Sequence, residues 1–243
     1  MIPQGQDQWL PRAWQGEGRP AVIVIHENRG LNPHIEDVAR RLAVEGYLVL
    51  APDLLSVNGG TPPDEDKARE LHAKTEREDM IAAALAAVPF MQKHAESTGK
   101  VGAVGFCFGG GIINRMAAGS PDLAAAVPEM VPAIKAALLL HYAENDENIN
   151  KGIAAYEAAL KANNKKFTIY IYPGTQHAFN NDTGAARYNK RRSRLEPDAR
   201  VLRGEFGRAA QGGVAAGGRF FWEPASRPAR LPCAGGGCLG TCR

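Results

Sequence analysis

Apolar residues in this chain fall into short continuous runs that alternate with segments of helical periodicity. Six runs have the length and composition of buried strands: residues 21–25, 47–51, 100–104, 123–127, 136–142 and 166–172. Helical spacing and capping residues predict helices between them: residues 33–45, 63–74, 75–90, 110–118 and 150–162. Apolar strands that alternate with helices are typical of parallel βαβ units. The pattern predicts a three-layer α/β fold, with a mostly parallel sheet and helices on both faces.

Two of the predicted helices begin at capping sequences. Asn32 is a good N-cap residue, and Pro33 follows it at the first helical position. Thr75 and Glu78 have the spacing of a capping box, in which Thr75 would cap the helix that follows.

Composition limits the class of protein. The chain has 243 residues, of which 44% are apolar, and this is enough for one domain with a sizeable core. No apolar run approaches the roughly 18 residues of a membrane span. The polar N-terminus lacks the pattern of a signal peptide. We therefore expect a cytoplasmic protein without a membrane partner.

The charge distribution separates residues 191–243 from the rest of the chain. This segment contains ten Arg, ten Gly, no Lys and four acidic residues, without a sustained helical period. The rest of the chain holds 19 basic and 22 acidic groups, so the net charge of +3 comes from this tail. We predict one domain over residues 20–190 and an atypical Arg/Gly-rich tail over residues 191–243. The tail would be either disordered or the product of a frameshift.

Cys107 is alone in the body of the chain, because Cys233, Cys238 and Cys242 all lie in the last eleven residues. An isolated cysteine suits a reducing compartment and a working thiol. The three terminal cysteines have no fourth Cys or His nearby, and no two histidines have metal-ligand spacing. We therefore expect neither a metal nor another cofactor.

Cys107 lies in the sequence Gly105-Phe106-Cys107-Phe108-Gly109, between a predicted strand and a predicted helix. This is the context of a nucleophile elbow, in which a sharp turn holds the nucleophile in a strained backbone region above the sheet. A buried structural cysteine is the alternative interpretation. A phosphate-binding loop is disfavoured, because no Gly-Lys-Ser/Thr follows and the G-x-G-x-x-G spacing is absent.

Further chemical groups follow predicted strands, at the edge where parallel sheets bind ligands. Glu27 comes after the first strand, Asp146 after the fifth and His177 after the sixth. A surface position for His177 and a helix cap for Asp146 are the alternatives. The order Cys107, Asp146, His177 favours a hydrolase triad, because nucleophile, acid and histidine occur in this order in α/β-hydrolases.

The other histidines are weaker candidates for the base. His26 and His141 also lie at strand ends, but both precede the acid along the chain. His34, His72 and His94 lie on predicted helices, where we expect them to be solvated.

These residues in this order resemble the dienelactone hydrolase family, the carboxymethylenebutenolidase-like proteins, over about residues 20–190. The most specific matching segments are residues 26–32 (HENRGLN), 104–111 (VGFCFGGG), 141–146 (HYAEND) and 172–182 (YPGTQHAFNND). The resemblance implies an α/β-hydrolase fold. It also implies that Cys107 is the nucleophile, that His177 is its base and that Asp146 orients His177.

The resemblance assigns three supporting groups as well. Glu27 corresponds to a family carboxylate that contacts the resting thiol and helps to activate it. The backbone N–H groups of Asn28 and Phe108 would form the oxyanion hole. The family opens the lactone ring of dienelactone (4-carboxymethylenebut-2-en-4-olide) to give maleylacetate, so the implied activity is hydrolysis of this lactone or of a related small ester. We expect a monomer without a nucleic-acid partner.

Two departures from the family pattern affect these expectations. Prototype members hold the substrate carboxylate with arginines, one of them shortly after the catalytic histidine, whereas here no Arg follows His177 before Arg187. Arg69 is a candidate for such an anion contact. The family also ends in an amphipathic helix that covers the sheet, and the composition of residues 191–243 predicts that this helix is lost.

A second hypothesis therefore stands beside the hydrolase. The chain could be an impaired or non-enzymatic product of a damaged gene, with a tail that binds RNA or another partner. Residues 218–222 (GRFFW) mix basic and aromatic side chains, as some RNA-binding tails do.

Overall fold

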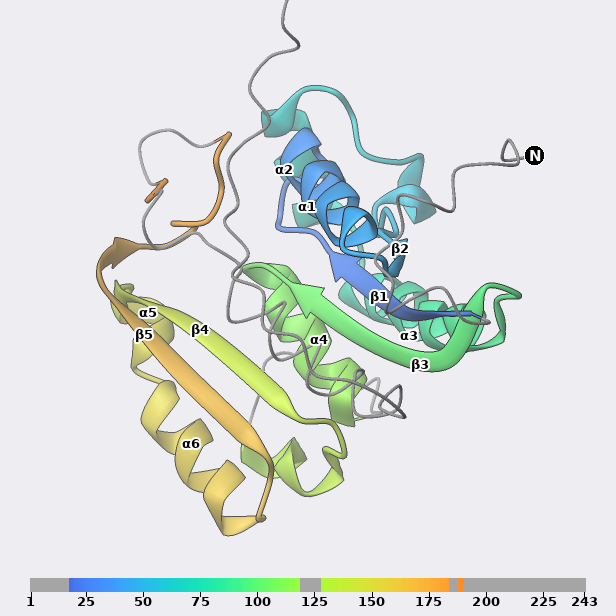
Figure 1. Cartoon of the computed structure of the whole chain (residues 1–243). Coiled ribbons are helices and arrows are strands. Elements are labelled where there is room, and N and C mark those ends of the chain that lie inside the picture. Colours follow the sequence, from blue (N-terminus) through green and yellow to red (C-terminus); the bar gives the residue numbers. More distant parts are fainter. Residues whose placement is uncertain (1–17, 119–127, 184–187, 190–243) are drawn as a thin grey trace, which may run out of the picture. The chain divides into compact units, whose positions relative to one another are not determined.

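The computed structural model describes residues 18–118, 128–183 and 188–189. The chain divides into two units, residues 1–210 and 211–243, and all the described residues belong to the first. The elements in chain order, shown in Figure 1, are β1 (Arg19–Ile25), α1 (Pro33–Val44), β2 (Leu48–Leu50), the 3₁₀ helix η3 (Ser56–Asn58), α2 (Glu65–Lys74), α3 (Arg77–Lys93), β3 (Ser97–Gly105), α4 (Phe108–Ala118), the 3₁₀ helix η4 (Pro128–Ala133), β4 (Leu138–Asn145), α5 (Glu147–Asn150), α6 (Ile153–Ala162) and β5 (Phe167–Gln176).

The described strands form two parallel sheets. One has the order β2-β1-β3 and the other pairs β4 with β5. The strand predicted over residues 123–127, which would follow β3 along the chain, lies outside the described residues. The α/β class with parallel strands is confirmed, although the described strands do not join in one continuous sheet.

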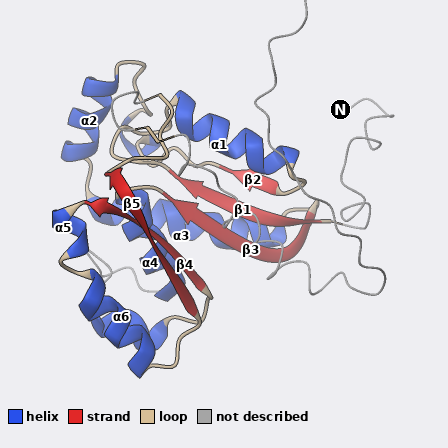
Figure 2. Cartoon of the chain, turned by 60° about the vertical axis from the view of Figure 1, so that its left-hand side comes forward, coloured by secondary structure: helices blue, strands red, loops and turns tan. Residues whose placement is uncertain are grey.

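Strand β1 lies in the middle of its sheet and is buried on both faces. Ala21, Ile23 and Ile25 pack with α3 and α4, whereas Val22 and Val24 pack with α1. Figure 2 shows these helices on opposite sides of the sheet. Because successive side chains of a strand point to opposite faces, a continuous apolar run needs a helix layer on each side. The predicted arrangement of helices on both faces is confirmed here.

The sheet of β4 and β5 packs against α6 and η4. Its core contains Leu138 of β4 and Tyr156 and Leu160 of α6. The helix predicted over residues 150–162 is present as α6, which begins slightly later than predicted, after the N-cap residue Gly152, and the short helix α5 precedes it.

Of the two predicted capping sequences, one is confirmed and one is wrong. The side chain of Asn32 accepts a hydrogen bond from the Ile35 N–H and caps α1. Helix α3 has Glu76 at its N-cap and no side-chain cap. The Thr75 hydroxyl instead donates to the Leu71 carbonyl at 2.8 Å, at the end of α2. The end of the preceding helix thus competes successfully for this side chain.

Several predictions concern residues that the structure does not describe. They concern the N-terminal part of the chain up to residue 17 and the tail over residues 191–243. Among the described helices, none is both long and apolar enough to cross a membrane.

Candidate active site

Cys107 sits in a sharp turn between β3 and α4. Its φ is 55°, in the left-handed region that non-glycine residues rarely adopt, and its side chain is exposed. A Cβ on Gly109 would lie 2.5 Å from the Ile25 carbonyl oxygen, and a Cβ on Gly105 would collide with the Gly109 backbone. Glycines on both sides of Cys107 therefore allow the first turn of α4 to pack directly on the end of β1. The predicted strained turn is present.

The Cys107 side chain meets two residues from the other sheet. The Nε2 atom of His177 lies 3.0 Å from the Cys107 Sγ atom, in hydrogen-bond contact. The opposite ring nitrogen, Nδ1, donates to the Asp146 Oδ2 atom at 2.6 Å. Asp146 occupies the N-cap position of α5, but its side chain makes no capping hydrogen bond. The structure thus brings all three predicted residues together in one chain of contacts.

The contacts of His177 also change its protonation. The hydrogen bond to Cys107 is the largest influence and raises the pKa of His177, burial lowers it, and the hydrogen bond to Asp146 raises it again. The result is a pKa of about 9, compared with an ordinary value of 6.5. His177 is therefore protonated at neutral pH in this arrangement.

Glu27 is buried at the end of β1 and has a different partner from the one that the resemblance implies. Its Oε2 atom accepts a hydrogen bond of 3.0 Å from the Asn181 side chain. Both side chains are almost completely enclosed, since Glu27 is 6% and Asn181 8% exposed. The Cys107 sulfur, in the same structure, is in contact with His177. Glu27 is thus engaged by the loop that follows β5.

Asn28 and Phe108 lie on the two segments that meet at the elbow. Asn28 follows Glu27 directly after β1, and Phe108 is the first residue of α4. The first N–H groups of an α-helix have no partner within the helix, so the Phe108 N–H is available to a ligand by helix geometry alone. The Phe106 N–H donates to the Ile25 carbonyl at 3.3 Å, which holds the elbow against the end of β1.

The two alternative bases have structural partners away from the thiol. His26 is fully buried, its Nδ1–H donates to the Glu27 carbonyl at 2.6 Å, and its Nε2 accepts from the Leu54 N–H at 3.0 Å. Burial lowers the pKa of His26, which fits this neutral ring. His141 contacts the Tyr172 hydroxyl at 2.7 Å and stacks on the ring of the same residue.

The prediction that the helical histidines are solvated is wrong for His34, which is 2% exposed. Its Nδ1 contacts Asp182, a residue far away in sequence. His72 is also partly enclosed, because its ring meets the edge of Phe108 with 4.4 Å between centroids. His94 is partly exposed and follows α3 as its C-cap residue.

Two arginines, one on α2 and one on α3, differ in their surroundings. Arg69 of α2 is 57% exposed and forms an ion pair with Asp66 on its own helix. Arg77, at the start of α3, lies over the Phe108 ring at 5.7 Å from its centroid. Sequence reasoning missed Arg77, because no local pattern connects it to the elbow. Within the described residues, no three His, Cys, Asp or Glu side chains are grouped so that they could hold a metal ion.

Comparison with known proteins identifies relatives along most of the chain. A family model described as the Dienelactone hydrolase family matches residues 11–199. The "Putative carboxymethylenebutenolidase" of Saccharolobus solfataricus is 32% identical in an alignment that covers 70% of this chain and 82% of that protein. A stretch of 57 residues, 24% of this chain, is 63% identical to a "Putative hydrolase fragment" of Escherichia coli K12, of which it spans 49%.

Solved structures give the same result. The crystal structure described as a "Putative Dienelactone Hydrolase" from Klebsiella pneumoniae has a TM-score of 0.66 and 26% sequence identity to this chain. The alignment covers 82% of this chain and 90% of that one. The predicted resemblance is therefore confirmed. The chain belongs to the dienelactone hydrolase family of ester-cleaving enzymes, with the α/β-hydrolase fold.

Proposed function

We propose that the chain hydrolyses carboxylic esters or lactones with Cys107 as its nucleophile. One observation carries this proposal: the Cys107 sulfur, the two nitrogens of His177 and the Asp146 carboxylate are connected by contacts of 3.0 and 2.6 Å. A nucleophile next to a base, with the base oriented by a third group, is the arrangement that covalent hydrolysis requires. The exposed sulfur in the elbow leaves room for a substrate carbonyl.

The chemistry would proceed in two steps. The Cys107 sulfur, its proton held by His177, attacks the substrate carbonyl carbon, and a tetrahedral oxyanion forms. Collapse of this intermediate breaks the carbon–oxygen bond of the ester, and His177 gives its proton to the departing oxygen. Water, deprotonated by His177, then attacks the thioester, which releases the acid and regenerates the thiol. The protonated state of His177 at neutral pH suits the first of these proton transfers.

The oxyanion would be stabilised by the backbone N–H groups of Asn28 and Phe108. The start of α4 supplies one of them, and the turn after β1 supplies the other. Backbone donors held by packed segments need no rearrangement as charge develops, and this makes such sites effective. The direct packing of Gly109 on β1 supports this assignment, since it brings the two segments into contact.

Glu27 is proposed to assist the thiol, and its contact with Asn181 makes that role testable. The substitution Glu27→Gln removes the charge but keeps an oxygen that can accept from Asn181. If the charge of Glu27 activates the thiol, the variant reacts more slowly with iodoacetamide than the wild type. If Glu27 acts through its contact with Asn181, the two proteins react at the same rate.

We propose dienelactone, or an ester of similar size, as the substrate. Arg77 supports a substrate that carries a carboxylate, because its guanidinium lies over the ring of Phe108, the residue that follows Cys107. Arg69 is the other candidate for this contact, although its ion pair with Asp66 competes with it.

Hydrolysis by the purified full chain tests the proposal. Dienelactone and a small aryl ester would be offered to the wild type and to Cys107→Ala, with circular dichroism as the check that both are folded. Turnover of dienelactone that is lost in the variant supports the whole proposal. Turnover of the aryl ester alone retains the thiol mechanism and rejects the named substrate. Equal activity in the wild type and in Cys107→Ala rejects the nucleophile.

A further inference from the structure

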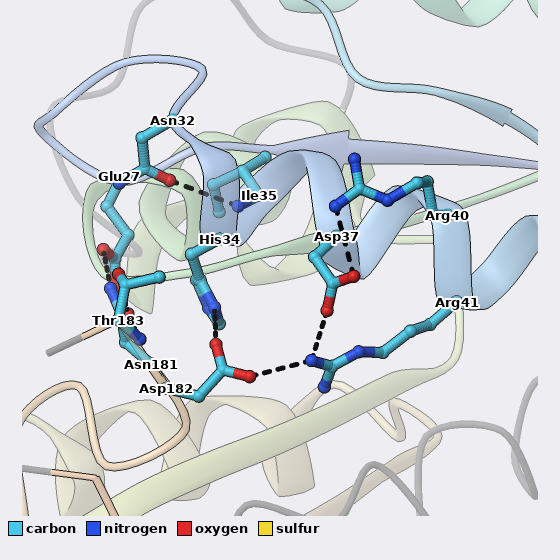
Figure 3. Close-up of polar contacts among 10 residues, drawn as sticks. All are labelled: Glu27, Asn32, His34, Ile35, Asp37, Arg40, Arg41, Asn181, Asp182 and Thr183. Atoms are coloured by element: carbon cyan, nitrogen blue, oxygen red, sulfur yellow. Dashed lines mark hydrogen bonds and ion pairs between the residues drawn. The ribbon is translucent and has the colours of Figure 1, made fainter. Parts of the chain in front are cut away.

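The loop that follows His177 is bound to α1 through a carboxylate (Figure 3). Asp182 lies between His34 and Arg41, which belong to the same helix. The His34 Nδ1–H donates to the Asp182 Oδ1 atom at 2.9 Å, and the Arg41 guanidinium donates to Oδ2 at 2.8 Å. Both carboxylate oxygens of Asp182 are therefore held by α1.

The residue before Asp182 makes a second attachment. Asn181 donates from its side chain to Glu27 at 3.0 Å, and its Oδ1 accepts from the Thr183 N–H at 3.0 Å. Figure 3 shows this contact beside the Asp182 cluster. The loop is thus fixed at two successive residues to the segment that contains the end of β1 and α1.

These attachments matter because the proposed catalytic residues come from different sheets. Cys107 follows β3, in the sheet β2-β1-β3, whereas Asp146 and His177 follow β4 and β5 in the other sheet. Among the described strands, no ladder of backbone hydrogen bonds joins the two sheets. The 3.0 Å contact between Cys107 and His177 therefore depends on contacts outside the ladders.

The loop also contains a strained backbone conformation that surrounding contacts must hold in place. Ala178, the residue after His177, has a φ of 63°, in the left-handed region that alanine rarely adopts. Strained backbone of this kind persists where surrounding contacts hold it in place. The contacts of Asp182 with α1 are suited to this task, since they lie in the same loop and involve the buried His34.

We propose that Asp182 is a positioning residue for the hydrolysis inferred above. Its carboxylate, bound by His34 and Arg41, holds the loop against α1 so that His177 meets Cys107. Asp182 itself does not touch the reacting atoms. The inference rests on the proposed function, because it gives His177 and Cys107 their roles.

The charges around Asp182 agree with this role. Partial burial raises the pKa of Asp182, but the hydrogen bonds and charges of Arg41 and His34 outweigh burial and leave this pKa below its ordinary value. Asp182 is therefore ionised at neutral pH. Within the described residues, the other ring nitrogen of His34 is buried without a hydrogen-bond partner, so Asp182 supplies the hydrogen bond of this ring. Asp37 is the second carboxylate on Arg41, on the helix side.

Helix α1 offers matched controls for a test. Asp182→Ala removes the carboxylate from the loop, and Asp37→Asn removes the other carboxylate that pairs with Arg41. Arg41→Gln removes one donor to Asp182. Arg40→Gln removes an adjacent arginine that pairs with Asp37. Each variant would be assayed for kcat and KM on a small aryl ester, and His177 would be titrated by NMR.

We expect Asp182→Ala to lower kcat about 100-fold with little change in KM, because displacement of a reacting group by about 1 Å has an effect of this size. Arg41→Gln should lower kcat by less, since the His34 bond remains. In both variants the pKa of His177 should fall from about 9 toward 6.5, because its contact with Cys107 is weakened. The two controls, Asp37→Asn and Arg40→Gln, should have the kcat, the KM and the His177 titration of the wild type.

The proposal is overturned if Asp182→Ala and Arg41→Gln retain the kcat and the His177 titration of the wild type. It is also overturned if Asp37→Asn lowers kcat as much as Asp182→Ala, which would indicate general damage to α1. Arg41 lies on the partly exposed surface of the helix, so its variant keeps the test decisive if Asp182→Ala does not fold. The titration of His177 needs no turnover and therefore separates this proposal from the proposed function, which the Cys107→Ala assay tests.

Discussion

A methyl group added at Gly109 should damage the elbow, whereas the same addition at Gly111 should not. Both glycines lie in α4, the helix that begins just after Cys107. A Cβ on Gly109 would be 2.5 Å from the Ile25 carbonyl oxygen and 2.7 Å from that of His26. These atoms belong to backbone at the buried end of β1, so they cannot rotate away. At Gly111, no atom outside the adjacent residues and the backbone of the helix itself lies within 4 Å of the added carbon.

The opposite surroundings give opposite expected effects on stability. An alanine in place of a helical glycine stabilises the helix by about 0.5–1 kcal/mol, and Gly111→Ala should show this gain. Gly109→Ala should gain a similar amount of helix stability, but forcing extra volume into a packed site costs about 1–3 kcal/mol. The difference between the two variants therefore isolates the collision at β1. For a chain of this size, 1 kcal/mol corresponds to about 2–4 °C in Tm.

Urea unfolding followed by circular dichroism measures this difference, provided that the dependence on urea has the same slope in both variants. Hydrolysis of an aryl ester adds a second measurement. A shift of the elbow moves Cys107 away from His177, so Gly109→Ala should also lose activity while Gly111→Ala keeps it. If Gly109→Ala were as stable and as active as Gly111→Ala, the close packing of α4 on β1 would be wrong, and with it the account of the elbow.

Three further predictions follow from the surroundings of the histidines. Cys107→Ala should lower the pKa of His177 from about 9, because the hydrogen bond to the sulfur is its largest cause, and an unchanged NMR titration would contradict this. The folded state binds the His177 proton more tightly than the unfolded state, in which the pKa of His177 is near 6.5. The stability that this proton contributes should therefore be complete below pH 6.5 and disappear as the pH rises through 9. The free energies of unfolding of the wild type and of His177→Gln should accordingly converge over this range. His26→Phe should destabilise the chain by about 1–3 kcal/mol for each buried group left without a partner, namely the Glu27 carbonyl and the Leu54 N–H, whereas retained stability in urea would show that these groups find other partners.

Patterns among neighbouring residues predicted those elements whose structure depends mainly on neighbouring residues. The apolar run of β1 indicated burial on both faces, and the structure has helices on both sides of it. Asn32 before Pro33 predicted the start of α1, because the cap and the helix are made by neighbouring residues. The same reasoning failed at Thr75, where the end of α2 uses the hydroxyl that the capping box needed. A capping sequence is therefore a weaker signal where another helix ends directly before it.

The family resemblance and the chain order indicated which groups would gather at the site, but not how each would be engaged. His34 was expected to be solvated because its position on α1 carries no sign of Asp182, which is 148 residues away in sequence. The contact of Glu27 with Asn181 spans 154 residues and was equally invisible. Such contacts depend on how the loop after β5 packs on α1 and on the end of β1, and no short-range pattern in the sequence indicates that packing.

The partner of Glu27 has a consequence for how the thiol is prepared. The resemblance assigns the Glu27 carboxylate to the Cys107 sulfur, whereas here it accepts from the Asn181 amide, and a hydrogen bond to a charged group contributes about 1.5–3 kcal/mol. A movement of the loop that breaks this bond would release Glu27 for the sulfur. The contacts of Asp182 with α1 oppose such a movement, since they fix the residue next to Asn181. In the wild type the sulfur should then stay with His177, and release of Asp182 should raise the share of Cys107 that faces Glu27. A comparison of thiol alkylation in Asp182→Ala and in the double variant with Glu27→Gln tests this coupling, because independent effects of the two changes would show that the loop and the thiol are not linked.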